Sequence, residues 1–250
     1  MKDVKHTLLD RRSIRRYERE PLTDEQVSFI HEAIRNTPTS YNGQQFSVVE
    51  VTDQPLKEQL YELTGQKQIK TCARFLLFCA DFHKINVAAE AKGLEIPPFT
   101  HTADGLIVGT VDAALAMMSA VAAAESMGLG TCCIGYARTA APRELSKLLG
   151  LPQGVYAVCG LAIGVPRELP DLKPKQPLGA VIHTNHYRSD DELRDKLLEY
   201  DTLITAYNRT RSGGKTTDND WADHILGYYR EAMNYEMLDA LNAQGFKPEK

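Results

Sequence analysis

The segment that decides the fold is ADGLIVGTVDAALAMMSAVAAAESMG, from Ala103 to Gly128. Its only charged residues are Asp104, Asp112 and Glu125. The uncharged stretch between Asp112 and Glu125 is shorter than the roughly 20 apolar residues that cross a bilayer. Its many Ala and Ser residues let another backbone approach closely. We therefore expect a buried central helix that lies near a subunit interface, with Ala120 at the seam, and no membrane span.

Short apolar runs predict strands on both sides of this helix. In chain order they are QFSVVEVTD, ARFLLFCADF, GTCCIGYA and VYAVCGLAIGVP. The first run alternates as a half-buried strand does, whereas the second is continuously apolar and predicts a strand buried on both faces.

End signals predict the helices between these strands. Thr23 and Gln26 form a capping box at the start of one helix. Pro55 and Gly65 mark the first turn and the end of the next. Shorter helices are predicted at DVKHTLLD and PRELSKLLG. Because helices and strands interleave throughout, the pattern predicts an α+β or mixed α/β domain.

The last third of the chain has a different composition. The stretch ELPDLKPKQPLG is rich in proline and basic, which predicts an extended arm. Two polar helices are predicted near Glu192–Tyr207 and Asp220–Gln244, with the basic loop NRTRSGGK between them. We therefore expect one domain over residues 1–250, of which residues 166–250 form the arm and C-terminal helices.

Composition excludes several classes of protein. The chain has 250 residues, 43% of them hydrophobic and 25% charged, which is typical of a soluble globular protein. A net charge of −4 gives no reason to expect nucleic-acid binding. The opening MKDVKHTLLD lacks the apolar core of a signal peptide. Five cysteines without regular spacing indicate reduced thiols and a cytoplasmic protein.

The segment RRSIRRY, Arg11 to Tyr17, holds four arginines around one serine. Guanidinium groups match phosphate oxygens two at a time, and a serine hydroxyl adds a neutral donor. The segment is therefore either an anion site or a solvated basic helix end. From these residues alone, both interpretations stay open.

The loop TPTSYNGQQFS, Thr37 to Ser47, joins a helix to a strand. Its amide side chains offer donors and acceptors together, which suits a flat heterocycle. The loop by itself favours a simpler interpretation, an Asx turn in which Gly43 supplies an unusual backbone angle.

No other motif in the sequence specifies a chemistry. GLGTCCIG does not have the spacing of a dinucleotide-binding fingerprint. His183 and His186 have no third candidate ligand, so we expect a polar surface loop and no metal site.

Taken in order, these pieces resemble the flavin-dependent nitroreductase family over nearly the whole chain. LTGQKQI and DWADHI extend the match, and the closest resemblance is to the NADPH-dependent branch of flavin reductases and oxygen-insensitive nitroreductases. The resemblance implies non-covalent FMN at a homodimer interface, in an α+β fold whose mixed sheet is flanked by helices. It implies no catalytic side chain, because FMN carries the chemistry.

The resemblance also implies which residues contact FMN. They match the family position by position and fall in five segments: Arg11, Arg12, Ser13 and Arg15; Thr39, Ser40, Asn42 and Gln44; Gln66; Cys133, Ile134, Gly135 and Tyr136; Lys173 and Lys175. The first segment corresponds to the phosphate site, with Arg15 near the pyrimidine edge. The second lies beside the ring and ribityl chain, the third at the pyrimidine end, and the fourth at N5 and O4. The two lysines reach the phosphate and ring edge.

Several of these positions depart from the family pattern. Arg11 stands where many members have His, and Tyr136 where a second glycine is usual. Asn42-Gly43 replaces an aromatic–aliphatic pair, and an aromatic residue is common at Cys133. Lys175 replaces Arg and loses the bidentate fork. Because most of these residues surround the ring, the acceptor substrate stays open.

The function implied is an FMN-dependent NAD(P)H oxidoreductase that transfers hydride in a ping-pong cycle. Nitroaromatics, quinones and free flavins are the expected small-molecule acceptors. The alternatives are a dedicated flavin reductase that supplies reduced FMN and a non-catalytic flavin carrier or sensor.

The nicotinamide donor has one candidate site in the sequence. The loop NRTRSGGK offers Arg209, Arg211 and Lys215 for the 2′-phosphate of NADPH. Charge alone favours a solvated turn, but Arg211 matches a position implicated in NADPH preference within the branch.

Overall fold

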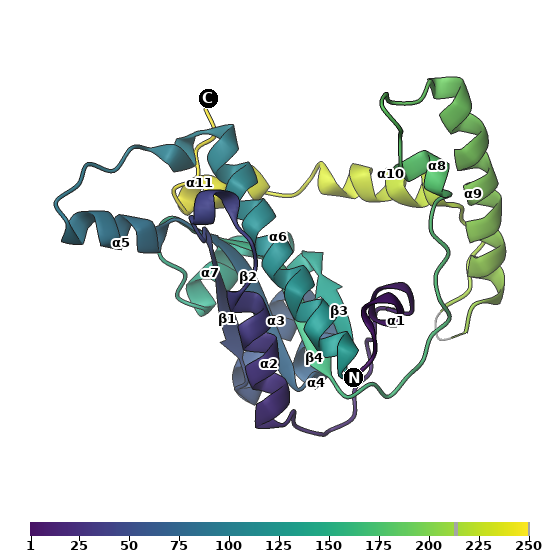
Figure 1. The fold of residues 1–250 in the computed structure, drawn as a ribbon, viewed down its shortest axis with the longest axis horizontal. Coiled ribbons are helices and arrows are strands. Elements are labelled where there is room, and N and C mark those ends of the chain that lie inside the picture. The colour runs from purple at the N-terminus through teal and green to yellow at the C-terminus, as the bar shows by residue number, and fades with distance from the viewer. Residues whose placement is uncertain (213–214, 250) are drawn as a thin grey trace. The chain divides into compact units, whose positions relative to one another are not determined.

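The computed structural model describes residues 1–212 and 215–249 (Figure 1). Its strands are β1 (Phe46–Val51), β2 (Arg74–Asp81), β3 (Gly130–Ile134) and β4 (Val155–Gly164). They form one sheet in the order β1-β2-β4-β3, and each pair of neighbours is antiparallel. A parallel bridge from Ser13 to Thr131 on β3 makes the sheet mixed at that edge. The four predicted strands are confirmed.

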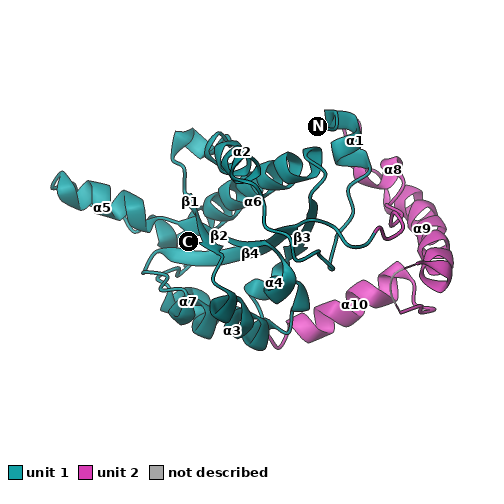
Figure 2. Cartoon of the chain, turned by 90° about the horizontal axis from the view of Figure 1, so that it is seen from below, with its two compact units in different colours: residues 1–168, 236–250 teal, residues 169–235 magenta. Residues whose placement is uncertain are grey.

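Helices surround the sheet. The α-helices are α1 (Val4–Leu9), α2 (Asp24–Arg35), α3 (Gln54–Thr64), α4 (Lys67–Thr71), α5 (His83–Ala91), α6 (Ala103–Ser126), α7 (Pro142–Leu148), α8 (Leu178–Val181), α9 (Asp190–Thr210), α10 (Trp221–Ala232) and α11 (Met237–Ala243). Single 3-10 turns are η1 (Ser40–Asn42), η2 (Phe99–His101) and η3 (Gly135–Ala137). Figure 2 shows α2 and α6 on one face of the sheet and α3, α4 and α7 on the other.

Local end signals explain where several helices begin and end. The Thr23–Gln26 capping box is formed in both directions at the start of α2. Gly65 ends α3 in the left-handed conformation, with φ 68°. Asp3 caps α1 by accepting the His6 N–H. The predicted capping box, the predicted end at Gly65 and the predicted short helix at DVKHTLLD are confirmed, because each depends on residues close together in the sequence.

The helix predicted over Asp220–Gln244 is wrong as a single element. The chain forms α10 and α11, separated at residues 233–236. Asn234 and Tyr235 donate their N–H groups to carbonyls three residues earlier, which tightens and ends α10. Asn is a weak helix former, and neither Gly nor Pro marks the break in the sequence.

The predicted central helix is confirmed as α6, which packs on the sheet through small residues. Ala113, Ala116 and Ala120 are completely buried in the core. A Cβ added at Gly109 would lie 2.7 Å from the Ala80 Cβ, so only glycine allows this approach. The expectation that Ala120 lies at a subunit seam is wrong, because its side chain faces the core of its own chain.

The outer face of α6 is apolar and exposed. Ile107, Val111, Leu115 and Met118 have exposed fractions of 58%, 44%, 42% and 41%. Their spacing of three and four residues places them in one line, which we call the α6 stripe. By length and composition α6 could cross a membrane. Its inner face, however, packs on the sheet of its own chain.

The chain divides into two compact units, coloured separately in Figure 2. The main unit comprises residues 1–168 and 236–250, and the arm unit comprises residues 169–235. Within the main unit, α11 returns to the core: Gln244 donates to the Val155 carbonyl at 2.8 Å, and Phe246 is completely buried. The arm unit contains α8, α9 and α10, with Tyr200, Ile204 and Asn208 buried.

Candidate functional site

The arginine segment is an extended stretch along the edge of the sheet, and no helix forms there. Ile14 donates its N–H to the Thr131 carbonyl at 2.8 Å. A Cβ at Gly130 would lie 2.8 Å from the Ile14 side chain, so glycine is required at this approach. The Tyr17 hydroxyl lies 2.6 Å from the Ile14 carbonyl oxygen. Buried Ile14 and Tyr17 therefore hold the segment in place and leave the arginines outside the core.

The arginines differ in their partners. Glu168 accepts the N–H groups of Arg15 and Arg16 at 2.7 and 3.2 Å and pairs with the Arg16 guanidinium at 3.7 Å. Arg12 donates Nε to the Asp10 carbonyl at 3.2 Å. In the part of the chain that the structure describes, the guanidinium groups of Arg11 and Arg15 have no hydrogen bond or ion pair. These two cations are available to an anion.

The end of β3 lies within electrostatic reach of Arg11. Partial desolvation by the surrounding chain raises the pKa of the Cys133 thiol, although the residue reaches the surface, and the Arg11 guanidinium acts in the opposite direction. Cys133 is exposed and Ile134 is buried, and η3 begins immediately afterwards at Gly135. The first N–H groups of a helical turn have no acceptor inside that turn. Gly135 is the first residue of η3, so its N–H has no acceptor inside η3. The structure thus brings Arg11, Ser13 and the predicted strand end together.

Sequence reasoning missed Glu125 as part of this region. It is buried at the end of α6 and accepts the Thr131 hydroxyl at 2.6 Å. Burial raises the pKa of Glu125, while the Thr131 hydrogen bond and the Arg11 charge lower it. The feature of the sequence that could have identified Glu125 is a single carboxylate at the end of an apolar helix.

Gln66 lies at the N-terminus of α4, where its Oε1 accepts from Gln68 Nε2 at 2.8 Å. Gln68 and Arg15 line one cavity of about 530 Å³. Gln66 and the arginine segment therefore belong to one neighbourhood of the main unit, linked through Gln68.

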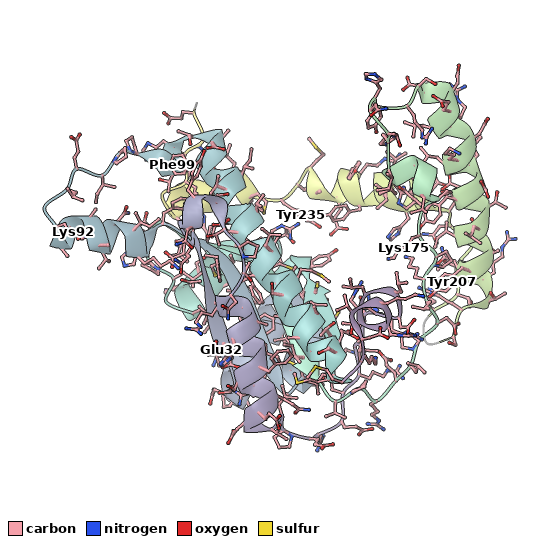
Figure 3. All side chains as sticks on the ribbon, in the orientation of Figure 1. Glu32, Lys92, Phe99, Lys175, Tyr207 and Tyr235 are labelled. Carbon is pink, nitrogen blue, oxygen red and sulfur yellow. The ribbon has the colours of Figure 1, made fainter. Side chains whose placement is uncertain are left out.

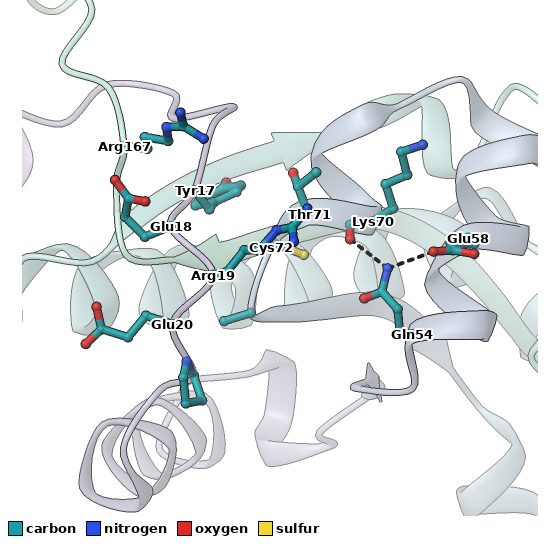
Figure 4. Close-up of a pocket in the computed structure, with 12 residues that line it drawn as sticks. Tyr17, Glu18, Arg19, Glu20, Gln54, Glu58, Lys70, Thr71, Cys72 and Arg167 are labelled. Carbon is teal, nitrogen blue, oxygen red and sulfur yellow. Dashed lines mark hydrogen bonds between the residues drawn. The ribbon is translucent and has the colours of Figure 1, made fainter.

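A larger cavity of about 670 Å³ adjoins the first and shares Tyr17, Thr71 and Arg167 with it (Figure 4). In Figure 4 Gln54 bridges Glu58 and the Lys70 carbonyl, at 3.2 and 3.1 Å. No predicted site residue lines this larger cavity. It carries charges of both signs, which favour no single class of ligand.

The loop Thr39–Gln44 is held by a buried carboxylate of α6. Asp112 is completely buried and accepts the N–H groups of Ser40 and Gln45 at 3.0 and 3.1 Å. Thr39 Oγ1 accepts the Gln44 N–H at 3.1 Å. Asp112 is a second residue that sequence reasoning did not assign, although it interrupts an apolar helix.

The predicted role of Gly43 is wrong. Its φ is −72°, whereas Tyr41, Asn42 and Gln44 have positive φ values of 54°, 54° and 51°. A Cβ at Gly43 would lie 2.2 Å from Gln45 Nε2, so a larger residue there would require the Gln45 side chain to move. Three non-glycine residues in the left-handed region indicate a loop whose shape its surroundings impose.

This loop and the arginine segment are anchored at different points along α6. The loop is bound to Asp112, whereas the Ser13–Thr131 bridge is bound to Glu125. These two carboxylates are separated by about 20 Å along α6, at 1.5 Å per residue.

The remaining predicted residues lie in the arm unit. Lys175 is exposed on the extended stretch before α8, and Tyr207 lies on α9 (Figure 3). Arg209 is paired with Asp218 at 2.7 Å. Arg211 ends α9 and donates one guanidinium nitrogen to the Lys215 carbonyl. The two glycines of this loop, Gly213 and Gly214, lie outside the described residues.

Family models match both parts of the chain. Residues 8–165 match the nitroreductase family, and residues 173–249 match the C-terminal domain of that family. The chain belongs to the nitroreductase family. The family and the α+β fold predicted from the sequence are therefore confirmed.

Full-length relatives extend this match. The nitroreductase-family chain is 41% identical to FMN reductase [NAD(P)H] of Bacillus subtilis, with 100% of both chains covered. It is 38% identical to the oxygen-insensitive NADPH nitroreductase of Salmonella typhimurium, with 96% of each covered. A solved hypothetical oxidoreductase from Bacillus subtilis has a TM-score of 0.94 at 40% identity, with 100% of both chains covered.

Proposed function

We propose that this nitroreductase-family protein is an FMN-dependent NADPH oxidoreductase with a ping-pong cycle. Its acceptors are nitroaromatics, quinones or free flavins. One observation carries the proposal: Arg11, whose guanidinium has no partner among the described residues, is two residues from Ser13, which bridges β3 at Thr131, as an FMN phosphate and ring require. Relatives named FMN reductase and NADPH nitroreductase, similar over their full length, support it.

The residues present fit FMN by their chemistry. Arg11 and Ser13, with Arg12, supply charged and neutral donors for a phosphate dianion. Arg15 and Gln66 supply a cation and an amide for the pyrimidine edge of the ring. When bound, FMN supplies the two-electron chemistry that accepts hydride from NADPH and delivers it to an acceptor.

The side chains of this protein then bind and orient; none transfers a proton. With FMN bound, the Arg15 cation would stabilise negative charge at the pyrimidine edge of the ring. Glu168 accepts the N–H groups of Arg15 and Arg16, and the Tyr17 hydroxyl donates to the Ile14 carbonyl, so the peptide groups on both sides of Arg15 are held. The Gly135 N–H, at the start of η3, would be a donor toward the hydride-accepting side of the ring and would add no competing base.

Spectra and stopped-flow kinetics separate this proposal from its alternatives. We expect a yellow protein with one FMN per subunit, bleached anaerobically by NADPH and re-oxidised by a nitroaromatic or quinone. Re-oxidation by free flavin alone would favour a dedicated flavin reductase. FMN that NADPH does not reduce would favour a carrier or sensor, and a protein that takes up no FMN would contradict the proposal.

We also propose a homodimer in which each flavin site is shared. The exposed α6 stripe offers an apolar surface, and such contiguous surfaces mark interfaces. The loop Thr39–Gln44 and the arginine segment of the same chain are anchored about 20 Å apart along α6, and we assign them to different flavin sites. A second copy would supply the loop, and the residues 1–250 would act as one FMN-binding domain.

Charges in the α6 stripe are expected to break the dimer. Val111→Asp with Leu115→Asp would bury two unpaired carboxylates at the interface and weaken dimerisation by at least about a hundredfold. Sedimentation velocity and the FMN content after desalting would measure the result. Ile85→Asp with Val87→Asp, on the exposed face of α5, is the matched control. Monomers that keep FMN would contradict the shared site.

Arg211→Ala is expected to discriminate between the nicotinamide donors. Losing one charged contact to the 2′-phosphate costs about 1.5–3 kcal/mol, which is about a ten- to a hundredfold loss of kcat/KM with NADPH. NADH has no 2′-phosphate, so we expect kcat/KM with NADH to stay unchanged. Arg209→Ala is the comparison, and we expect a smaller effect because Asp218 already holds Arg209. Equal losses with both donors would refute the assignment.

We further propose that the protein works in the cytoplasm, on small molecules and without nucleic acid or a membrane. All five cysteines are free thiols, and four of them are buried. No metal enters the proposal, since the described residues contain no group of three His, Cys, Asp or Glu side chains that could hold one.

A further inference from the structure

The carboxylate of Glu125 lies where both burial and the end of a helix disfavour it. Glu125 is next to the last residue of α6 and only 6% exposed. The C-terminal end of a helix carries partial negative charge, and burial adds a desolvation cost to any carboxylate. A side chain that breaks two local rules at once is expected where function requires it.

Thr131 is the residue through which Glu125 reaches the arginine segment. Glu125 accepts the Thr131 hydroxyl at 2.6 Å, and Thr131 is completely buried on β3. The Thr131 carbonyl accepts the Ile14 N–H at 2.8 Å, and its backbone forms the parallel bridge with Ser13. On its other side Thr131 pairs with Ile163 of β4. Thr131 therefore joins α6, the sheet and the arginine segment at a single residue.

Cations from two other elements act on the same carboxylate. Burial raises the pKa of Glu125, whereas the Thr131 hydrogen bond and then the charges of Arg11 and Lys2 lower it. Lys2 belongs to the N-terminal stretch, whose backbone donates to the Ser126 carbonyl at 2.7 Å. Glu125 thus lies within electrostatic reach of the arginine that we assign to the FMN phosphate.

We propose that Glu125 is a positioning residue of the FMN phosphate site and acts through Thr131. By fixing the Thr131 side chain, it holds Ser13 and Ile14 in register with β3, and with them Arg11, which is two residues before Ser13. Glu125 is itself an anion, so direct contact with a phosphate dianion would be repulsive and its role is indirect. The inference rests on the proposed function, because it requires FMN at this segment.

The alternative is a hydrogen bond that only closes the connection from α6 to β3. Riboflavin separates the two roles, because it has the ring and ribityl chain of FMN and lacks the phosphate. A purely structural hydrogen bond would affect both flavins equally. A positioning role at the phosphate site lowers the ratio of FMN affinity to riboflavin affinity.

The test measures the affinity of the full-chain apoprotein for FMN and for riboflavin by flavin fluorescence. In Thr131→Val, which loses the hydroxyl and keeps the shape, we expect the affinity ratio to fall by about tenfold. Thr131→Ser and Glu125→Gln keep a donor and an acceptor, so their ratios should stay within about threefold of the native ratio. Glu125→Leu removes the acceptor and the buried charge together, and it provides the same test if Thr131→Val does not fold.

A variant of Arg11 provides an independent comparison. If Glu125 acts by positioning Arg11, then Thr131→Val should reduce the affinity ratio less in an Arg11→Ala background than in the native one. Ser146→Ala is the matched control, because this buried hydroxyl on α7 donates to the Pro142 carbonyl at 2.8 Å. We expect Ser146→Ala to lower the unfolding temperature and to leave the affinity ratio unchanged.

Two outcomes would overturn the inference. One is an equal change, or no change, in the affinity for both flavins in Thr131→Val and Glu125→Leu. The other is a Glu125→Gln variant that loses as much of the ratio as Glu125→Leu, since the acceptor for Thr131 would then not matter. If the ratio falls as expected but NADPH does not reduce the bound FMN, the inference stands and the proposed function fails. If NADPH reduces FMN but the ratio is unchanged in the variants, the proposed function stands and the inference fails.

Discussion

The double variant Arg11→Ala, Ser13→Ala is expected to lose FMN without losing its fold. Among the described residues the Arg11 guanidinium makes no hydrogen bond or ion pair, so its removal breaks no such interaction within the fold. The Ser13 backbone bridge to Thr131 does not need the hydroxyl. Two contacts to a charged phosphate, at about 1.5–3 kcal/mol each, predict a loss of about 3–6 kcal/mol in FMN binding. This loss corresponds to an increase of more than about a hundredfold in the Kd for FMN.

Flavin fluorescence on titration with FMN would measure that affinity, and thermal unfolding of the apoprotein would test the fold. Arg16→Ala is the matched control, because this arginine is 77% exposed and faces Glu168. We expect it to change FMN affinity by less than about 1 kcal/mol. Unchanged FMN affinity in the double variant would show that the arginine segment has only a structural role, at the edge of the sheet.

Asp112→Ala is expected to destabilise the protein and release FMN together. The carboxylate holds two backbone N–H groups of a loop in which Tyr41, Asn42 and Gln44 have positive φ. Leaving two donors without their charged acceptor costs about 2–6 kcal/mol in the free energy of unfolding. The strained turn would then relax, and a loop that has relaxed cannot bind the flavin in the same way.

Urea unfolding and FMN titration of the same samples would check this expectation. Asp112→Asn is the graded control, because the asparagine amide keeps one acceptor oxygen. We expect this variant to lose less stability and less FMN affinity than Asp112→Ala. Full stability in Asp112→Ala would mean that water replaces the carboxylate. Full stability combined with weaker FMN binding would assign Asp112 a role in the loop alone.

The features predicted from the sequence are those that neighbouring residues determine. The Thr23 capping box, the left-handed Gly65 and the apolar strands depend on contacts within a few positions. The hydrogen bond from Ser40 to Asp112 spans 72 residues, and no local pattern specifies it. The candidate site depends on such distant contacts, so the sequence alone could name its residues only through a family resemblance.

Ala120 and Gly43 show a second limit of the sequence. A small side chain permits close packing against either a partner or the core, so composition could not tell which face of α6 turns outward. The larger residues Leu115 and Met118 mark that face, because they stay 42% and 41% exposed. Gly43 likewise serves a close approach and not a special φ.

The return of α11 to the main unit has a consequence for how the chain is made. Phe246 packs against Phe82 and Tyr156, with ring centroids 6.0 and 6.1 Å apart. Phe246 is translated 90 residues after Tyr156, with the whole arm unit between them, which is a delay of roughly 5–18 s at ribosomal speed. During that time the nascent main unit exposes the apolar surface that Phe246 later covers. A ribosome that stalls within the arm unit therefore leaves an unfinished core, a substrate for chaperones or proteases.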